Sequence, residues 1–463
     1  MTQNGGTSGA KAPLRGPELS GADCFVLALN RMMTRNGQTG LGAQTHLVLA
    51  AAPDLDQLRE AADKLGRLHP ILTARVSRNP FTLLPYWRLP GSGKPLLITH
   101  WREAGVSNAS GEAEEISSLQ AWSEDILNRP LSGKDGWCNC RVDLVYLRDG
   151  RTVLVLTWSH LLFDGRGAEH LAAILLKGAE DRVAVVPQRT ADVSIRLMDR
   201  IRGARPVVEH FFRLARNTYV SLGGGSAVPG RLRFAVKTLG ETQTEAAVDR
   251  ARALSGPLFN IAFYLACAAR GHRRVFLSRS VDPAHYVVSV PVQIRRKGIA
   301  PSPFQNSVTI LFFCLEREDL LTLDSAVGAA QKQFEEMTRS GLDRSFSHVL
   351  EIMKRLPERL YMHWVGSQFG GEITSFFHSY TGEFTLPLDT VFGSRALNAY
   401  HVPCVSAPPG SGLFLGVFKG RLSVTFSWRD SAVTPEEAGL MMDQVLLDLT
   451  GEAAIDVPEG QGA

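Results

Sequence analysis

The chain has 463 residues, of which 44% are hydrophobic and 21% are charged, and its formal net charge is +4. This composition excludes a disordered chain, and the small net charge argues against a nucleic-acid-binding protein. A chain of this length exceeds one ordinary hydrophobic core, so two domains or lobes are expected.

The cysteines and the termini bear on compartment and cofactors. Six cysteines, at positions 24, 138, 140, 267, 314 and 404, form neither a disulfide framework nor a pair of CxxC knuckles. Residues 1–16 are polar and glycine-rich, unlike a signal peptide, and no run of about 18 apolar residues predicts a membrane span. We therefore expect a reduced, cytoplasmic protein with no metal site and no tightly bound cofactor.

Helices and strands alternate through the first part of the chain. Apolar residues at helical spacing predict helices over 19–33 and 54–71, and short apolar runs predict strands over 44–52 and 73–78. The segment 137–160 is typical of two strands joined at Asp149-Gly150, a strong hairpin signal. A further helix is expected over 168–180.

Residues from about 186 to 235 form a basic, partly amphipathic segment. Positions 189 to 216 contain seven arginines, two aspartates and one glutamate, which gives a local charge of +4. One interpretation is a solvated helix face that crosses between lobes. The other is a surface for an acidic carrier protein or for anionic lipid at a membrane.

The second half repeats the mixed style. Helices are predicted over 244–256, 257–272 and 321–340, strands over 285–294 and 307–315, and a hairpin over 411–428 that turns at Lys419-Gly420. The last helix, over 434–450, begins with a capping box formed by Thr434 and Glu437. We expect an N-terminal lobe over 1–185, a crossover over 186–235 and a C-terminal lobe over 236–463.

The stretch WSHLLFDGRG, residues 158–167, carries the most chemical information. An apolar run delivers His160 to a turn that holds Asp164 and Gly165. A zinc site would need further ligands nearby, and a serine hydrolase would need a GxSxG elbow, which is missing. A core histidine does not explain the polar turn. The pattern therefore favours a general base that removes a proton from an attacking hydroxyl or amine.

The stretch SHLLFDGRG resembles the HxxxDG motif of the condensation-domain and CoA-dependent acyltransferase superfamily. Ser159 stands where many members have a first histidine. Other stretches agree with the family in the same order, namely LSGAD (19–23), LHPILTAR (68–75), NRPL (128–131), SVPVQIR (289–295), FQN (304–306), HSYTG (378–382, in the place of a loop) and GRLSVTFSW (420–428).

The resemblance implies an α/β fold with mixed sheets. Two chloramphenicol-acetyltransferase-like lobes would form a V with a tunnel between them. It also implies that His160 is the base and that Asp164 is structural, paired with Arg295 or, as a second choice, with Arg75.

The resemblance further implies roles for neighbouring residues. Gly165 would let the backbone pass close to the base. Asn306 and Ser379 would lie across the cleft, with Ser379 a candidate donor to the oxyanion, and Ser159 is a further candidate beside the substrate.

The function that follows from the resemblance is acyl transfer, of a kind used in lipid or secondary metabolism. The donor would be a thioester of CoA or of a carrier protein's phosphopantetheine, and the acceptor a hydroxyl or amine that attacks directly. Two alternatives remain: a non-catalytic binding module, and a free-standing condensation enzyme whose substrates ride on carrier proteins.

Overall fold

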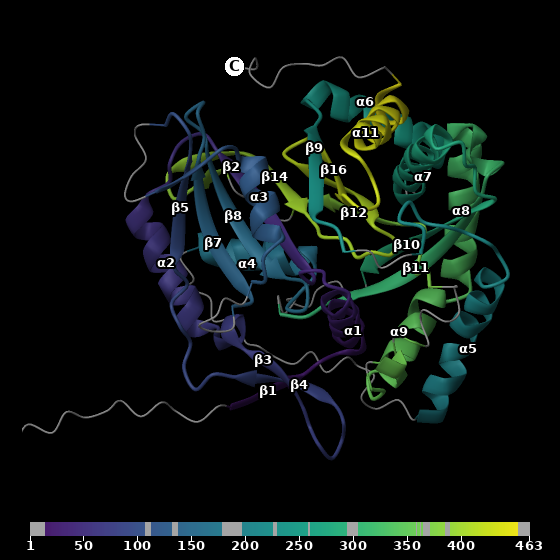
Figure 1. The fold of residues 1–463 in the computed structure, drawn as a ribbon, viewed down its shortest axis with the longest axis horizontal. Helices are drawn as coiled ribbons and strands as arrows, with labels where there is room; N and C mark the ends of the chain where they lie inside the picture. Colours follow the sequence, from purple (N-terminus) through teal and green to yellow (C-terminus); the bar gives the residue numbers. More distant parts are fainter. Residues whose placement is uncertain are drawn as a thin grey trace, which may run out of the picture.

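A computed structural model gives the fold of the chain (Figure 1). The described residues are 14–106, 113–131, 138–177, 197–225, 229–257, 260–293, 304–357, 359–361, 363, 371–384 and 389–451. Their strands form three sheets, and the two larger sheets are the centres of two lobes that stand side by side (Figure 1). The predicted α/β fold with mixed sheets and two lobes is confirmed.

The N-lobe is built on a seven-stranded sheet in the order β13-β14-β2-β8-β7-β5-β6. Its strands are β2 (Gly42–Leu49), β5 (Ile98–Glu103), β6 (Glu114–Ile116), β7 (Cys140–Tyr146), β8 (Thr152–Ser159), β13 (Thr390–Val391) and β14 (Ser394–Val402). Side chains of β8 alternate between two apolar clusters, so both faces of the sheet are covered. Helices α2 (Leu55–Leu68) and α4 (Gly165–Leu176) bury one face, and α3 (Leu119–Leu127) packs on the other.

The C-lobe is built on a six-stranded sheet in the order β11-β10-β12-β15-β16-β9. Its strands are β9 (Leu232–Thr238), β10 (His285–Gln293), β11 (Val308–Glu316), β12 (Phe376–Glu383), β15 (Ser411–Phe418) and β16 (Arg421–Arg429). Its helices are α5 (Leu197–Leu214), α6 (Glu241–Ser255), α7 (Asn260–Ser278), α8 (Leu323–Arg339), α9 (Leu342–Met353) and α11 (Pro435–Thr450), with a short 3-10 turn at Asp319–Leu321. The helices and the sheet share the largest apolar core of the described chain.

A small three-stranded sheet lies below the N-lobe in Figure 1. Its strands, in the order β1-β4-β3, are β1 (Leu14–Glu18), β4 (Pro85–Leu89) and β3 (Arg75–Arg78), and a 3-10 turn at Pro70–Thr73 precedes β3. The chain then leads from β1 into α1 (Gly21–Arg35), which reaches α9 of the C-lobe. A Cβ at Gly21 would lie 2.6 Å from the backbone carbon of Leu350, so glycine permits this close contact.

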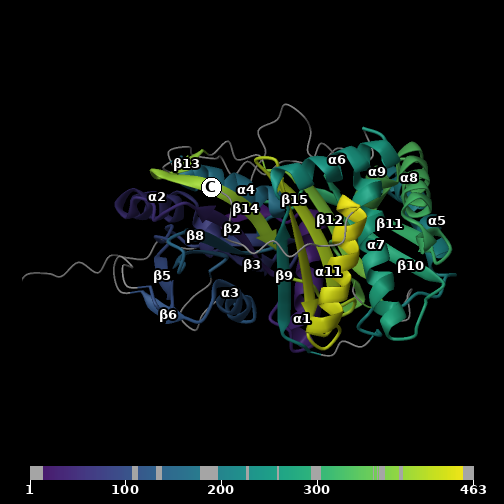
Figure 2. The ribbon, with the colours of Figure 1, turned by 90° about the horizontal axis from the view of Figure 1, so that it is seen from above.

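The C-terminal part of the chain completes the N-lobe sheet. Strand β14 pairs antiparallel with β2, from Ala396 opposite Leu49 to Val402 opposite Gln44, and Figure 2 shows it running beside β2 and β8. Strand β9, in contrast, begins inside the segment expected to be a crossover and joins the C-lobe sheet. The two lobes are therefore interleaved in sequence, because pairing with β14 covers an edge of β2 that would otherwise be open.

Several local predictions are confirmed. Strands β7 and β8 form the expected hairpin, and Gly150 has the positive φ of +86° that its turn requires. Strands β15 and β16 turn at Lys419-Gly420, where both residues have positive φ. Helix α11 begins with the capping box of Thr434 and Glu437.

One local expectation is wrong. Residues 378–382 were expected to form a loop, but they lie within β12, which pairs in parallel with β10 on one side and β15 on the other. The turn-like residues cause only an irregularity between Tyr380 and Glu383, where Gly382 has a φ of +74°. His378, Ser379 and Tyr380 pair with β15 alone, because the pairing with β10 involves only Phe376 and Phe377. Pairing with one neighbouring strand thus outweighs the local propensity.

The basic segment forms α5, which packs against α9 in the C-lobe. Ala204, Val207 and Leu214 are buried in the C-lobe core, and the backbone N–H of Val207 donates to the Ser345 hydroxyl at 3.2 Å. Three arginines of α5 are exposed, at positions 202, 205 and 213, and Arg216 is exposed just after the helix ends. Arg189 and Arg196 lie outside the described residues.

Candidate active site

Backbone hydrogen bonds fix His160 at the end of β8. The N–H of the preceding Ser159 donates to the Asn139 carbonyl at 2.9 Å, and the N–H of His160 donates to the Leu41 carbonyl at 2.9 Å. The N–H of Leu162 then closes a turn onto the Ser159 carbonyl at 2.9 Å. The backbone of the candidate base is therefore held on both sides, as the strand-then-turn pattern predicted.

The His160 imidazole is half-buried beside the indole of Trp158, with 5.6 Å between the ring centroids. Its Nδ1 is buried and has no hydrogen-bond partner in the part of the chain that the structure describes.

Asp164 braces the turn that follows His160 and also ties the two lobes together. It is the N-cap of α4, and its Oδ1 accepts from the Gly167 N–H at 2.9 Å. Its Oδ2 accepts from the N–H of Ser307, a residue that precedes β11 of the C-lobe, also at 2.9 Å. The side chain is 5% exposed, so both bonds are shielded from water.

The structure describes one of the two arginines that were predicted to pair with Asp164. Arg295 lies outside the described residues, and Arg75 is an exposed residue of β3. Gly165 is the first residue of α4. A Cβ added there would meet the His401 ring at 3.7 Å, an ordinary contact distance, so available space does not itself require glycine.

Asn306 is buried and reaches from the segment before β11 of the C-lobe to the backbone of His160 in the N-lobe. Its side-chain amide donates to the Asp23 carboxylate at 2.9 Å and to the His160 carbonyl at 3.0 Å, and its backbone N–H also donates to Asp23 at 2.9 Å. Burial raises the pKa of the Asp23 carboxyl, although hydrogen bonds from Asn306 and Ser20 act to lower it. Asn306 is thus a connector between α1, the base and the C-lobe.

The same C-lobe segment contacts the N-lobe through an aromatic ring. Phe304 is buried in the N-lobe core, 5.2 Å from the His69 ring between centroids. His69 is 1% exposed and burial lowers its pKa. Residues 304–307 therefore anchor the C-lobe to the N-lobe on both sides of the His160 turn, through one apolar and two polar contacts.

The remaining candidates occupy different positions. The Ser159 hydroxyl accepts from the Leu161 N–H at 3.3 Å, so it stabilises the turn. Ser379 is a half-buried residue of β12, opposite Phe414 of β15. Within the described part of the chain, no hydrogen bond joins Ser379 to the cluster of His160, Asp164 and Asn306.

A second polar network was not predicted from the sequence. Arg166, which follows Gly165 in the motif, contacts the buried Glu169 carboxylate at 2.7 Å and donates to the carbonyls of Thr381 and Glu383 in β12. The other Glu169 oxygen lies 3.3 Å from Nε2 of His401 in β14. This network links α4 to two strands contributed by the C-terminal part of the chain.

The network continues through β2 to the C-terminal end of β8. His401 Nδ1 lies 3.0 Å from the Thr45 hydroxyl, which accepts from the Trp158 indole N–H at 3.1 Å. The indole in turn packs beside His160. The arginine after the DG pair was the available signal in the sequence, but its partners are distant in sequence and could not be inferred.

No three His, Cys, Asp or Glu side chains gather among the described residues as a metal site would require, and no described helix is long and apolar enough to cross a membrane. The Cys138 thiol donates to the Cys140 carbonyl at 2.7 Å, and burial raises the pKa values of both thiols.

Comparisons with known proteins bear on the fold of the chain. No family model and no curated protein sequence matches the chain. Among solved structures, trichothecene 15-O-acetyltransferase from Fusarium sporotrichioides is similar, with a TM-score of 0.67, 12% identity and 97% of each chain covered.

Two condensation domains are also similar. The first condensation domain of the calcium-dependent antibiotic synthetase has a TM-score of 0.65 and 16% identity, with 94% of this chain and 96% of that one covered. The starter condensation domain of rhizomide synthetase, in a double-mutant form with C8-CoA and Leu-SNAC, has a TM-score of 0.61 and 13% identity, with 96% and 97% covered. The chain therefore shares its fold with these acetyltransferase and condensation-domain structures, as the resemblance predicted.

Proposed function

We propose that the protein is an acyltransferase that moves an acyl group from a thioester to a hydroxyl or amine, with His160 as the general base. The proposal rests on the way in which hydrogen bonds hold the backbone of His160. Its backbone is fixed on the N-lobe side by Leu41 and on the C-lobe side by Asn306, while its imidazole stays half-buried where the lobes meet. A base held in this way is pre-oriented for a substrate that enters between the lobes.

The proposed reaction is a direct attack without a covalent enzyme intermediate. His160 takes the proton of the acceptor as the acceptor oxygen or nitrogen bonds to the thioester carbonyl carbon. The tetrahedral intermediate then collapses, the carbon–sulfur bond breaks, and the thiolate takes the proton back from the imidazolium. Because Nδ1 is buried, we assign both proton transfers to Nε2.

The remaining site residues have proposed supporting roles. Asp164 and Asn306 hold the turn and the backbone carbonyl of the base, so they are positioning residues. Ser379 is the proposed donor to the oxyanion, and removing one such donor costs about 100-fold to 1,000-fold in kcat in known cases. Arg295 remains the proposed partner of Asp164. The tunnel between the lobes remains a proposal as well.

The similar structures support a thioester donor. One is an O-acetyltransferase and another was solved with an acyl-CoA. A second candidate function is condensation of carrier-bound substrates, because a condensation domain matches over 94% of this chain with a TM-score of 0.65.

The test is product formation by the purified full chain. We would incubate it with acyl-CoAs of graded length and with a panel of alcohols and amines, and detect esters and amides by mass spectrometry. His160→Ala should lower the rate by at least about 100-fold. His285→Ala, which changes a half-buried histidine on β10 of the C-lobe, is the matched control and should retain activity.

Each outcome has a definite meaning. Wild-type turnover by His160→Ala would refute the assignment of the base. Product from acyl carrier protein but not from acyl-CoA would favour the condensation function. Thioester binding without product from any donor would favour a non-catalytic binding module.

A further inference from the structure

Three arginines form a row across the small sheet. Arg15 of β1 and Arg75 of β3 are both directly opposite Arg88 of β4, so the three side chains share one face of the sheet, and all three residues are exposed. Like charges directly opposite each other repel and destabilise a sheet. Glu18 pairs with Arg15 at 2.8 Å at the exposed edge.

The surrounding sequence adds to the positive charge. Between Asp63 and Glu103 the chain contains no aspartate or glutamate, whereas it contains seven lysines and arginines, at positions 64, 67, 75, 78, 88, 94 and 102. This local excess contrasts with the near balance of the whole chain, which has 50 basic and 46 acidic residues. The row of arginines therefore suits an anionic partner.

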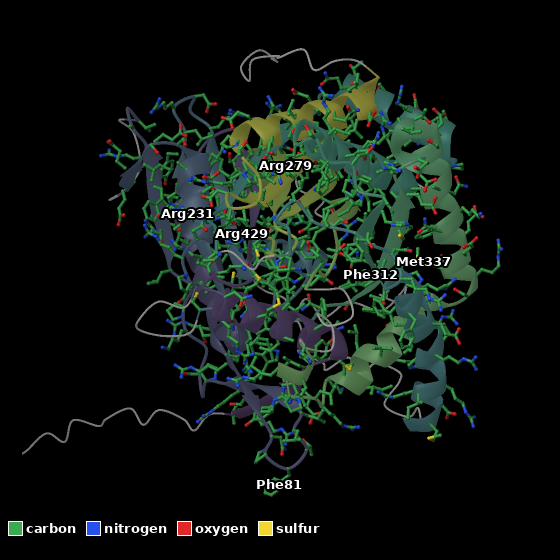
Figure 3. All side chains as sticks on the ribbon, turned by 45° about the vertical axis from the view of Figure 1, so that its right-hand side comes forward. Phe81, Arg231, Arg279, Phe312, Met337 and Arg429 are labelled. Atoms are coloured by element: carbon green, nitrogen blue, oxygen red, sulfur yellow. The ribbon has the colours of Figure 1, made fainter. Side chains whose placement is uncertain are left out.

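The hairpin that joins β3 to β4 ends in exposed apolar side chains. Phe81 is 94% exposed and Leu83 is 49% exposed, and Figure 3 shows Phe81 at the tip, pointing away from the body of the protein. Exposed single apolar residues are common, but a phenylalanine held out at the end of a projecting hairpin beside a row of arginines is a more specific combination.

The tip is an ordered loop rather than a loose one. The Asn79 side-chain oxygen accepts from the N–H groups of Phe81 and Thr82 at 2.8 and 3.1 Å, and the Leu83 N–H donates to the Asn79 carbonyl at 2.9 Å. The Arg78 guanidinium donates to the Leu83 carbonyl at 2.6 Å. The loop is thus built to hold its apolar side chains outward, which lowers the entropy lost when they are buried by a partner.

We propose that this hairpin docks the protein on an anionic lipid bilayer. The Arg75–Arg88 pair is three residue pairs behind the Arg78–Pro85 pair at the strand ends, or about 10 Å at 3.3 Å per residue. Apolar side chains of peripheral proteins enter about 5–10 Å into the headgroup region. Phe81 lies beyond the strand ends, so the arginine row is more than about 10 Å behind it. With Phe81 at that depth, the row faces the lipid headgroups within about a Debye length of the surface charge.

The shape of the surface favours a bilayer over a folded protein partner. A narrow convex tip can bury Phe81 and Leu83 fully only in a deep pocket or in a fluid medium, and a bilayer supplies the second. The hairpin is tied to the start of α1, because the Leu19 N–H donates to the Pro85 carbonyl at 2.9 Å, and α1 carries Asp23, the partner of Asn306. Docking would bring the site near the membrane surface, although the proposal does not depend on the catalytic assignment.

The experiment is co-sedimentation of the full chain with two kinds of vesicle. One contains phosphatidylcholine alone, and the other contains about 30% phosphatidylglycerol, which makes the surface strongly negative. We expect binding to the anionic vesicles that weakens with salt. Phe81→Ser should lower the partition coefficient by about 10-fold or more. Arg75→Ser with Arg88→Ser should lower it by about 5-fold per arginine.

Two matched controls separate this surface from others. Phe212→Ser removes a phenylalanine that is 60% exposed on the basic helix α5, and Lys332→Ser with Arg339→Ser removes two exposed charges from α8. Both should bind vesicles as the wild type does. Loss of binding in Phe212→Ser with retention in Phe81→Ser would overturn the proposal, as would no vesicle binding by the wild type. Binding of an acidic carrier protein that depends on Phe81, without vesicle binding, would overturn it in favour of a protein partner.

Discussion

The contact of Asp164 with both lobes makes a quantitative prediction for Asp164→Ala. The substitution removes the N-cap of α4, which costs about 1 kcal/mol, and leaves the Ser307 N–H without this acceptor in a buried position, which costs about 1–3 kcal/mol more. We therefore expect a loss of about 2–4 kcal/mol in the free energy of unfolding. Both bonds are 2.9 Å long and Asp164 is 5% exposed, so solvent offers little replacement.

The structure supplies a matched control for this prediction. Asp54 is the N-cap of α2 and accepts from the N–H groups of Asp56 and Gln57. It is exposed, and among the described residues its side chain makes no hydrogen bond to the C-lobe. Asp54→Ala should cost only the capping contribution, about 1 kcal/mol. The difference between the two variants isolates the contact between Asp164 and Ser307.

Urea denaturation would measure the two losses, and hydrogen exchange would locate them. In Asp164→Ala we expect faster exchange at the amides of Gly167 and Ser307, whereas in Asp54→Ala the faster exchange should be confined to the start of α2. If Asp164→Ala is no less stable than Asp54→Ala, and exchange at Ser307 is unchanged, then Asp164 does not brace the two lobes.

Two further predictions concern buried polar groups. Arg166→Met should destabilise the fold by about 3 kcal/mol because it leaves the Glu169 carboxylate buried without its cation, and adding Glu169→Gln should restore part of that loss; a double-mutant cycle in urea checks this, and strictly additive losses would contradict it. Burial lowers the pKa of His272 to about 3 and that of His378 to about 4. Because these pKa values are depressed in the folded state, the unfolded chain binds protons first as the pH falls below 6.5, so stability should fall by about 1.4 kcal/mol per pH unit for each histidine. His378→Gln should make the dependence of the unfolding free energy on pH shallower between pH 6.5 and 4, and an unchanged slope would refute the role of His378.

The features that could be predicted from the sequence are those whose interacting residues lie close together along the chain. The turns at Asp149-Gly150 and Lys419-Gly420 depend on backbone angles of one or two residues, and the capping box at Thr434 closes within one helical turn. The strand that delivers His160 to a turn is likewise a property of adjacent residues. Signals of this range are complete in the local sequence, so these elements formed where they were expected.

Asn306 shows where local reasoning stopped. The sequence singled it out, and the structure places it at the site, but its partners Asp23 and His160 are 283 and 146 residues away. Its side-chain N–H groups are used in these contacts, whereas its Oδ1 has no hydrogen-bond partner among the described residues, so we assign it a positioning role for the base. The role of Asn306 therefore depends on the residues, distant in sequence, that pack around it in the folded protein.

The amino-acid sequence by itself determined the alternation of helices and strands, the hairpins and caps, and the histidine motif. The tertiary structure alone decided that β14 completes the N-lobe sheet, that residues 378–382 are a strand, and that Arg166 meets Glu169 and His401. The physical reason is range. Propensities and caps act over a few residues, whereas an open strand edge or a buried charge is satisfied by whichever part of the chain packs against it, however distant that part is in sequence.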